Sequence, residues 1–344
     1  MSPLKVVFLG TPEFAVPTLE ALVAAAAPLP HGRGSETASP ALPSRDPDIP
    51  FRGAGREGAD VLEVITQPDR PRGRKRELIP SPVKAAALRH GIPVYQPERI
   101  RRPEAIEHLR ALGPDVMIVV GYGQIIPQSV IDIAPLGIIN VHASLLPELR
   151  GAAPIQWSIV RGYERTGVTT MRIDAGLDTG DTLDQWDTPI GPDETAPELS
   201  ERLAAAGARL LMQTLAELAA GTAHPVPQDD ARATLAPILK KEDGRIDWHC
   251  SAHQIHNRIR GFQPWPGAHT LFRGQSLHLW RSRLVPQRWN LGPGALVQGE
   301  GVFAVGGDGA SLELLEVQLE GRKKMPAAVF AHGHRLTPED RLGI

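Results

Sequence analysis

Apolar runs alternate with amphipathic segments over about the first 220 residues of the chain. The continuous apolar run at 6–9 is of the kind found in buried parallel strands, and further strands are predicted at 61–66, 93–95 and 115–120. Segments with apolar residues at helical spacing lie between them, at 14–26, 82–90 and 103–112. This alternation predicts an α/β domain built on a mostly parallel, Rossmann-like sheet with right-handed crossovers.

The same pattern continues toward the middle of the chain. It predicts a strand at 137–139, a helix at 154–162, a strand at 167–173 and a long amphipathic helix at 198–219. Thr195 and Pro197 suit the start of the last helix, and Gly221 suits its end. Residues 221–236 are polar and contain Pro225 and Pro227, which predicts a linker between domains at 221–237.

The chain changes character after the linker. A helix is predicted at 250–260, followed by short strands at 268–272, 276–284, 294–298, 302–306 and 311–318. Short strands separated by glycine predict a small OB-like β-barrel. Residues 238–344 carry a net charge of about +4, so the other residues are negative in sum. This asymmetry favours a nucleic-acid partner for a C-terminal domain at 238–344, beside an N-terminal domain at 1–220.

One segment of the N-terminal part breaks the alternation. Residues 27–59 are rich in Pro, Gly, Ser and Ala and mix charges of both signs. Such a composition buries too little apolar surface to offset the entropy of ordering the backbone. We therefore predict a disordered surface insertion between the first helix and the second strand.

Charge and cysteine content exclude some classes of protein. The formal net charge is −2, so any basic surface must be local. The single cysteine, Cys250, excludes an intrachain disulfide and a thiolate zinc cage, which fits a reducing cytosol. No apolar run approaches the eighteen residues that a membrane span needs. These features predict a soluble, cytoplasmic protein.

A basic run follows the strand at 61–66. Its five basic side chains lie within seven residues and are Arg70, Arg72, Arg74, Lys75 and Arg76. A solvated surface loop is one interpretation of such a run. The alternative is phosphate binding, because α/β proteins bind ligands in loops that follow the carboxyl ends of their strands.

Three turns after predicted strands carry candidate chemistry. The first, Gly10-Thr11-Pro12, lacks the G-x-G-x-x-G pattern and so argues against nicotinamide dinucleotide binding. In the next, Asn140 and His142 are two residues apart and project from one face of an extended strand. An amide beside an imidazole can bind a developing oxyanion and move a proton, although the pair could also only cap the strand. The third, 174–181, holds three aspartates without the spacing of a calcium loop.

Several of these stretches resemble one family. Asn140-Val141-His142, followed by Ser144-Leu145-Leu146-Pro147 and Arg150-Gly151, resembles the signature of the folate-dependent formyltransferases. GTPEFA at 10–15, GLDTGD at 176–181, KKEDGRIDW at 240–248 and GFQPWPGA at 261–268 resemble segments of the members that act on tRNA. The resemblance covers essentially the whole chain apart from residues 27–59.

The resemblance implies a reaction and the residues that perform it. It implies transfer of the formyl group of the co-substrate 10-formyltetrahydrofolate to the α-amino group of methionyl initiator tRNA, for translation initiation, with no metal. Asn140 would bind the oxyanion, His142 would stabilise charge or relay a proton, and Asp178 would orient His142.

The resemblance also implies binding residues and partners. The basic run would contact the acceptor arm of the charged initiator tRNA. We expect the protein to be a monomer and not to bind a membrane. The substrate and folate cleft would be lined by Gly10, Thr11, Phe14, Gln124, Ile125, Ile126, Ser144, Leu145, Leu146, Pro147, Arg150 and Gly151. For Phe14, packing in the core is an equal alternative, and for the two isoleucines it is the competing role.

Two other functions stay open at this point. A formyltransferase that acts on a nucleotide-linked amino sugar would use the same Asn140, His142 and Asp178, although it would need neither the basic run nor a basic C-terminal domain. A folate- or RNA-binding module without catalysis is the second alternative. The presence of all three catalytic residue types argues against it.

Overall fold

The computed structural model of the protein describes residues 3–26, 59–72 and 77–343. Contacts between its residues divide the chain into two compact units. The first unit contains 1–142, 168–186 and 204–228, and the second contains 143–167, 187–203 and 229–344.

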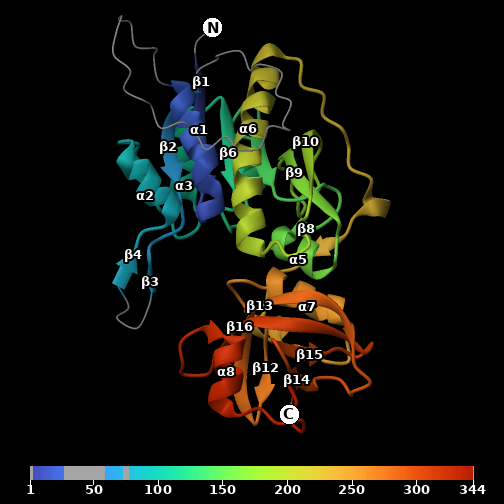
Figure 1. Ribbon diagram of the computed structural model, residues 1–344. Helices are drawn as coiled ribbons and strands as arrows, with labels where there is room; N and C mark the ends of the chain where they lie inside the picture. Colours follow the sequence, from blue (N-terminus) through green and yellow to red (C-terminus); the bar gives the residue numbers. More distant parts are fainter. Residues whose placement is uncertain (1–2, 27–58, 73–76, 344) are drawn as a thin grey trace, which may run out of the picture. The chain divides into compact units, whose positions relative to one another are not determined.

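A seven-stranded sheet forms the centre of the first unit (Figure 1). Its strands lie in the order β10-β9-β7-β6-β1-β2-β5. All pairings from β5 to β7 are parallel, whereas β9 is antiparallel to β7. The bounds are Leu4–Gly10 (β1), Ala59–Ile65 (β2), Val94–Tyr95 (β5), Val116–Val120 (β6), Ile138–His142 (β7), Arg165–Arg172 (β9) and Thr182–Pro189 (β10). This topology confirms the predicted mostly parallel α/β sheet.

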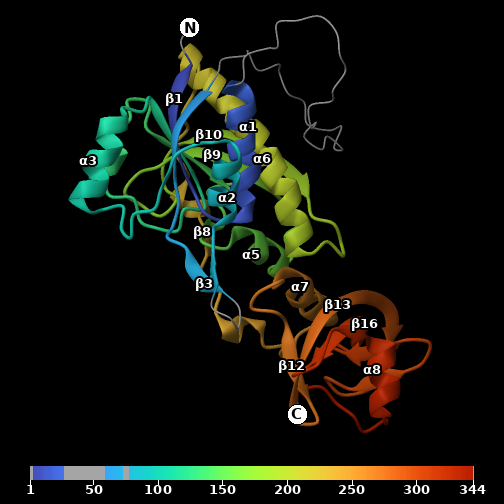
Figure 2. The ribbon, with the colours of Figure 1, turned by 90° about the vertical axis from the view of Figure 1, so that its left-hand side faces the viewer.

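Helices cover both faces of this sheet. Figure 2 shows α3 on one side of the sheet and α1 and α6 on the other. The bounds are Glu13–Ala15 (η1), Val16–Ala26 (α1), Pro82–Arg89 (α2), Pro103–Leu112 (α3), Gln128–Ile131 (α4) and Ala196–Ala220 (α6). Local sequence sets the helix ends: the Ser81 side chain accepts a hydrogen bond from Lys84 N at the start of α2, and Gly113, at φ +59°, ends α3.

Arg70 and Arg72 of the basic run lie on β3, the first strand of a hairpin that extends from the first unit (Figure 1). Strand β3 (Arg70–Arg72) pairs antiparallel with β4 (Glu77–Ile79). Asp69, just before β3, accepts hydrogen bonds from Lys84 and Gln96, and these bonds lower the pKa of its carboxyl. The base of the hairpin is therefore fixed to the sheet. Arg74, Lys75 and Arg76 lie outside the described residues.

The second unit contains a six-stranded antiparallel sheet with helices packed against it. The strand order is β12-β13-β16-β15-β14, with β17 beside β16. The strands are His269–Phe272 (β12), Gln275–Arg288 (β13), Leu296–Gln298 (β14), Val302–Val305 (β15), Ala310–Leu319 (β16) and Met325–Pro326 (β17). The other elements are Arg150–Gly151 (β8), Pro154–Val160 (α5), Asp230–Arg232 (η2), Leu235–Ala236 (β11), Lys241–Gly244 (η3), Ala252–Gly261 (α7) and Ala327–His334 (α8).

The end of the chain closes this sheet into a barrel. Leu342 bridges Phe272 of β12, and Arg341 bridges Ala295 beside β14. Leu342 N donates to Gly294 O at 2.8 Å, so the segment 341–343 lies between the two edge strands. Apolar side chains from the strands, α7 and α8 fill one shared core. This arrangement confirms the predicted OB-like β-barrel.

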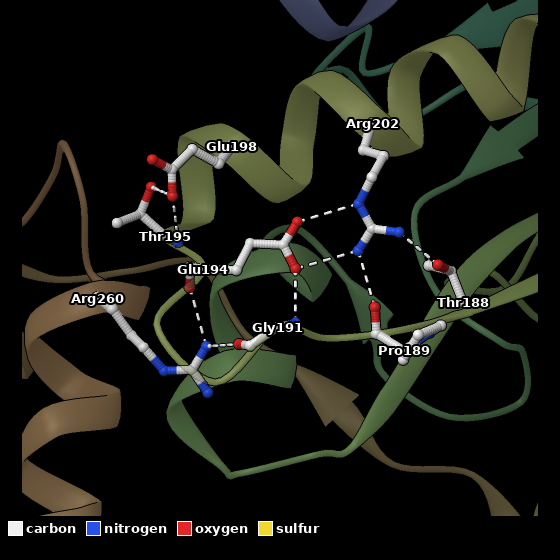
Figure 3. Close-up of polar contacts among 8 residues, drawn as sticks. All are labelled: Thr188, Pro189, Gly191, Glu194, Thr195, Glu198, Arg202 and Arg260. Atoms are coloured by element: carbon white, nitrogen blue, oxygen red, sulfur yellow. Dashed lines mark hydrogen bonds and ion pairs between the residues drawn. The ribbon is translucent and has the colours of Figure 1, made fainter. Parts of the chain in front are cut away.

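The turn between β10 and α6 is held by two arginines of the second unit (Figure 3). Arg260 of α7 donates from Nη1 to the carbonyl oxygens of Gly191 and Glu194 at 3.0 and 2.9 Å. Arg202 of α6 donates to both carboxylate oxygens of Glu194, each at 3.0 Å, and to the hydroxyl of Thr188. Glu194 in turn accepts from Gly191 N at 2.9 Å. The turn thus has a continuous set of hydrogen-bond partners.

The sequence left some parts of the fold unpredicted. Strand β10 and helix α8 were not expected, and β13 is longer than its prediction. Of the predicted insertion at 27–59, only Ala59 is described, as the buried first residue of β2. Residues 27–58 lie outside the described residues.

Candidate active site

The candidate site lies at the carboxyl end of β7. Val141 of this strand packs against Gly207 of α6, where a Cβ added to the glycine would lie 2.8 Å from Val141 Cγ1. Successive side chains of a strand alternate between the faces of the sheet. Asn140 and His142 therefore project from the face opposite α6, the face on which Ile138 packs into the core. Both are buried, with 8% and 5% of their surface exposed.

Asp178 completes a cluster with these two side chains. Its Oδ1 accepts a hydrogen bond from Asn140 Nδ2 at 3.4 Å, and its Oδ2 lies 3.7 Å from His142 Nδ1. The carboxylate thus contacts the amide and the imidazole with different oxygens. An imidazole can take up and release a proton, and an amide that donates one N–H to a carboxylate keeps its second N–H for another acceptor. The cluster can therefore bind a negative charge and hold a proton.

The loop that carries Asp178 has an unusual backbone. Asp178 adopts a left-handed conformation, at φ +53°, which few residues other than glycine tolerate. Asp174 braces the loop from inside by accepting hydrogen bonds from Gly176 N at 3.0 Å and Thr179 Oγ1 at 2.8 Å. Gly180 lies so close to the carbonyl oxygen of Arg172 that a Cβ would clash there. These contacts aim the Asp178 side chain back toward β7.

Loops after β1, β2 and β6 meet beside the cluster's strand. Gln67 donates from Nε2 to the carbonyl oxygens of Tyr122 and Gly123 at 3.0 and 3.1 Å, and Thr11 Oγ1 also donates to Tyr122 O. The Tyr122 ring is buried in the core, and this burial raises the pKa of its hydroxyl. At Gly123, which has a φ of +77°, an added Cβ would lie 2.8 Å from Gln67 Nε2 and would displace that side chain. The three loops are therefore fixed to one another.

The predicted folate segment divides into residues with different surroundings. Gln124 Oε1 accepts from Ile100 N at 2.9 Å, and its Nε2 donates to Glu98 O, so its side chain holds the neighbouring loop. Ile126 packs against the core. Ile125 is 91% exposed, so of the two isoleucines only Ile125 presents an apolar side chain fully to solvent.

The residues after His142 belong to the second unit and are mostly buried. Ser144 Oγ donates to Glu148 O at 2.6 Å, and Leu149 N donates to Thr234 Oγ1 at 2.9 Å. Leu146 and Pro147 are also buried, and Leu145 is half-buried. This segment is a compact turn whose polar groups satisfy each other.

Strand β8 is held by the segment that was predicted to be a linker. Arg150 is 6% exposed and donates to Asp230 Oδ1 at 2.8 Å. Gly151, at φ +120°, pairs with Ala236 of β11, and a Cβ on the glycine would lie 2.7 Å from Ala236 O. Both residues therefore have structural contacts in addition to any contact with a substrate.

The remaining predicted residues belong to the first unit and differ in exposure. Gly10 is buried at the end of β1, and Phe14 in η1 is half-buried. Arg70 is exposed and donates from Nη2 to Gln67 Oε1 at 3.4 Å. The backbone of Arg72 ends β3.

Sequence reasoning missed two side chains that shape the site, Gln67 and Gln228. Gln67 fixes the loop after β6, and Gln228 donates to the carbonyl oxygens of Asp178 and Gly180. Each bonds to the backbone of a distant segment, and such bonds leave no local pattern in a sequence.

Two broader features bear on function. Within residues 3–26, 59–72 and 77–343, no group of three or more His, Cys, Asp or Glu side chains is arranged to hold a metal ion. None of the helices in these ranges is long and apolar enough to cross a membrane.

Two family models match the chain. One, described as formyl transferase, matches residues 52–215, and the other, described as formyl transferase, C-terminal domain, matches 238–335.

Curated proteins and solved structures extend these matches. The chain is 58% identical over 340 residues to methionyl-tRNA formyltransferase of Solibacter usitatus, covering 99% of each chain. It is 52% identical over 339 residues to the enzyme of the same name from Koribacter versatilis, covering 98% of each. Among solved structures, an N-formyltransferase of Helicobacter canadensis in complex with folinic acid and dTDP-3-aminofucose matches with a TM-score of 0.61 at 18% identity, covering 91% of this chain and 99% of that one. At that identity, the structural match shows a shared fold alone. The chain therefore belongs to the formyl transferase family, together with the curated relatives that it matches over almost their full length.

Proposed function

We propose that this protein transfers the formyl group of 10-formyltetrahydrofolate to the α-amino group of methionyl initiator tRNA. The observation that carries the proposal is the convergence of Asn140, His142 and Asp178 at the end of β7. The curated relatives, named methionyl-tRNA formyltransferase, support tRNA as the acceptor.

Asn140 would act on the charge that develops during the reaction. The α-amino nitrogen forms a bond to the formyl carbon, and the carbonyl oxygen becomes an oxyanion. One N–H of Asn140 is directed at Asp178, which leaves the other for this oxygen. A single donor of this kind contributes about 100-fold to 1000-fold in kcat.

His142 and Asp178 would handle the proton. The attacking amine must lose a proton, and the folate nitrogen must gain one when its bond to the formyl carbon breaks. His142, next to the carboxylate of Asp178, can take up the first proton and return it, or remain protonated and stabilise the oxyanion. Asp178 would orient the ring.

The loops around the cluster would bind the formyl donor. The backbone at 121–123 is hydrogen-bonded by Gln67 and Thr11, and Ile125 offers an exposed apolar surface for a flat ring. Gly10, Thr11 and Phe14 would line the side that receives the methionyl group. Of the residues after β7, the buried Arg150 and the half-buried Gly151 would contribute to substrate binding through the turn that they hold.

The acceptor would be held by basic residues elsewhere. The run at 70–76 would contact phosphates of the acceptor arm, and the barrel domain at 238–344, which has a net charge of about +4, would add to this binding. In this proposal the catalytic domain spans 1–220, and 221–237 joins it to the barrel.

A panel of acceptors tests the proposal. With 10-formyltetrahydrofolate as donor, we expect fast formylation of charged initiator tRNA and little formylation of charged elongator tRNA or of nucleotide-linked amino sugars. The cluster could formylate an amino sugar equally well. Preference for the sugar nucleotide would therefore reject tRNA as the acceptor but not formyl transfer as the reaction. Absence of transfer to every acceptor would reject both.

A further inference from the structure

Gln228 differs from its neighbours in the chain. Every other residue from His224 to Arg232 is exposed, as expected for a segment predicted to be a linker. Gln228 alone within this fully described stretch is half-buried. Its side chain therefore turns toward the body of the first unit instead of toward solvent.

The buried end of Gln228 contacts the loop that carries Asp178. Its Nε2 donates to the carbonyl oxygen of Asp178 at 2.9 Å and to that of Gly180 at 2.7 Å. Both partners are carbonyl oxygens, which can only accept, so the amide nitrogen and not its oxygen must face the loop. One side chain thus holds two peptide groups on either side of Thr179.

The backbone at 226–228 is itself fixed in place. Val226 and Thr182 exchange two hydrogen bonds, with Thr182 N donating to Val226 O at 2.9 Å and Val226 N donating to Thr182 O at 2.8 Å. This antiparallel bridge sets the register of the segment beside the start of β10. Because the bridge lies two residues from Gln228, the amide reaches the loop from a rigid position.

Gln228 contacts the loop at the residue that has a left-handed backbone conformation. Asp174 holds Gly176 N and the Thr179 hydroxyl from inside the loop. Asp178 sits in the left-handed region at φ +53°, where an aspartate is less stable than in the usual regions of backbone space. Gln228 donates to the carbonyl group of this residue and so contributes a hydrogen bond from outside the loop.

We propose that Gln228 is a positioning residue for Asp178 and, through it, for His142 and Asn140. This inference rests on the proposed function. Gln228 contacts the backbone of Asp178, whose carboxylate contacts both other side chains. Loss of the amide would let the loop relax, and a carboxylate displaced by about 1 Å lowers turnover by on the order of 100-fold.

The test is a set of variants assayed by single-turnover formylation of charged initiator tRNA. Gln228→Ala should lower the rate at saturating substrates 10-fold or more, with the Michaelis constants for tRNA and formyl donor within twofold of wild type. Gln228→Glu keeps the length of the side chain but offers the carbonyls no donor when ionised, so it should lose as much. Val226→Ala is the matched control, because it truncates an exposed side chain of the same segment and leaves the backbone bridge intact.

A double variant separates positioning from general destabilisation. If Gln228 acts through Asp178, adding Gln228→Ala to Asp178→Asn should lower the residual rate by less than twofold. A rate for Gln228→Ala within threefold of the Val226→Ala rate would overturn the inference, as would full activity in Gln228→Glu or a further 10-fold loss in the double variant. A wild-type protein that fails to formylate any acceptor would instead reject the proposed function, so the two failures are distinguishable.

Discussion

Replacing Arg260 by alanine should destabilise the protein far more than replacing a surface arginine. Arg260 is 7% exposed, and its guanidinium donates three hydrogen bonds, to the carbonyl oxygens of Gly191 and Glu194 and to Asn257 Oδ1. Truncation leaves all three acceptors without this donor. Figure 3 shows how the two carbonyl groups converge on the guanidinium.

The expected magnitude follows from these contacts. A buried acceptor that loses its donor costs about 1–3 kcal/mol, and water entering the vacated space recovers part of this. Taking the lower end for each acceptor, we expect Arg260→Ala to lower the free energy of unfolding by about 3 kcal/mol. Arg260→Lys keeps the charge but not the planar fork, so it should fall between alanine and wild type.

Arg281→Ala provides the matched control. Arg281 also pairs with a residue of the α6 region, Glu198, at 2.9 Å, but both side chains are about half exposed. Exposed pairs of this kind contribute about 0–1 kcal/mol. The assay is urea denaturation followed by circular dichroism, at one pH and one salt concentration. An Arg260→Ala variant no less stable than Arg281→Ala would refute the argument that the buried hydrogen bonds hold this turn.

Three further predictions concern charge, backbone space and the basic run. Burial raises the pKa of Asp184, so the folded protein holds that proton more tightly than the unfolded chain, and the stability from this group falls as pH rises from the unfolded pKa through the folded one. In denaturant titrations, the stability of Asp184→Asn minus that of wild type should therefore be larger at pH 7 than at pH 4. An equal difference at the two pH values would contradict this. Gly123→Ala should raise the Michaelis constant for the formyl donor in initial-rate assays, because a Cβ would displace Gln67. Gly91→Ala is the control, since Gly91 has a similar φ but no atom within 4 Å of an added Cβ, and it should leave this Michaelis constant unchanged. Arg74→Ala should raise the Michaelis constant for tRNA more than the Michaelis constant for the donor. It should also lower the slope of the log binding constant for tRNA against log salt concentration by the amount expected for about one phosphate contact. An unchanged Michaelis constant for tRNA would argue against a role of Arg74 in tRNA binding.

Most of the fold could be predicted because its elements follow simple patterns. Strands β1 and β6 are continuous apolar runs, and they lie buried at the centre of the sheet. Strand β10, with the sequence TLDQWDTP, escaped prediction because its polar residues mask any alternation. Helix α8, with the sequence AAVFAHGH, escaped because its apolar residues form one continuous run that shows no helical period.

Only part of the candidate site could be predicted from local sequence patterns. The spacing of Asn140 and His142 placed both on one face of a strand, because that spacing is local. Asp178 lies 38 residues beyond Asn140, and only the resemblance to a family connected the two. Gln67 and Gln228 remained unpredicted, because their roles depend on which carbonyl groups the folded chain brings within reach.

Asn140→Ala tests the central claim most directly. The side chain makes one long hydrogen bond in the structure, at 3.4 Å, so its removal should change the free energy of unfolding by no more than about 1 kcal/mol. Its proposed role at the oxyanion predicts a fall in kcat of about 100-fold to 1000-fold for formylation of charged initiator tRNA, with both Michaelis constants nearly unchanged. A variant that folds and turns over at the wild-type rate would contradict the account of formyl transfer at this cluster.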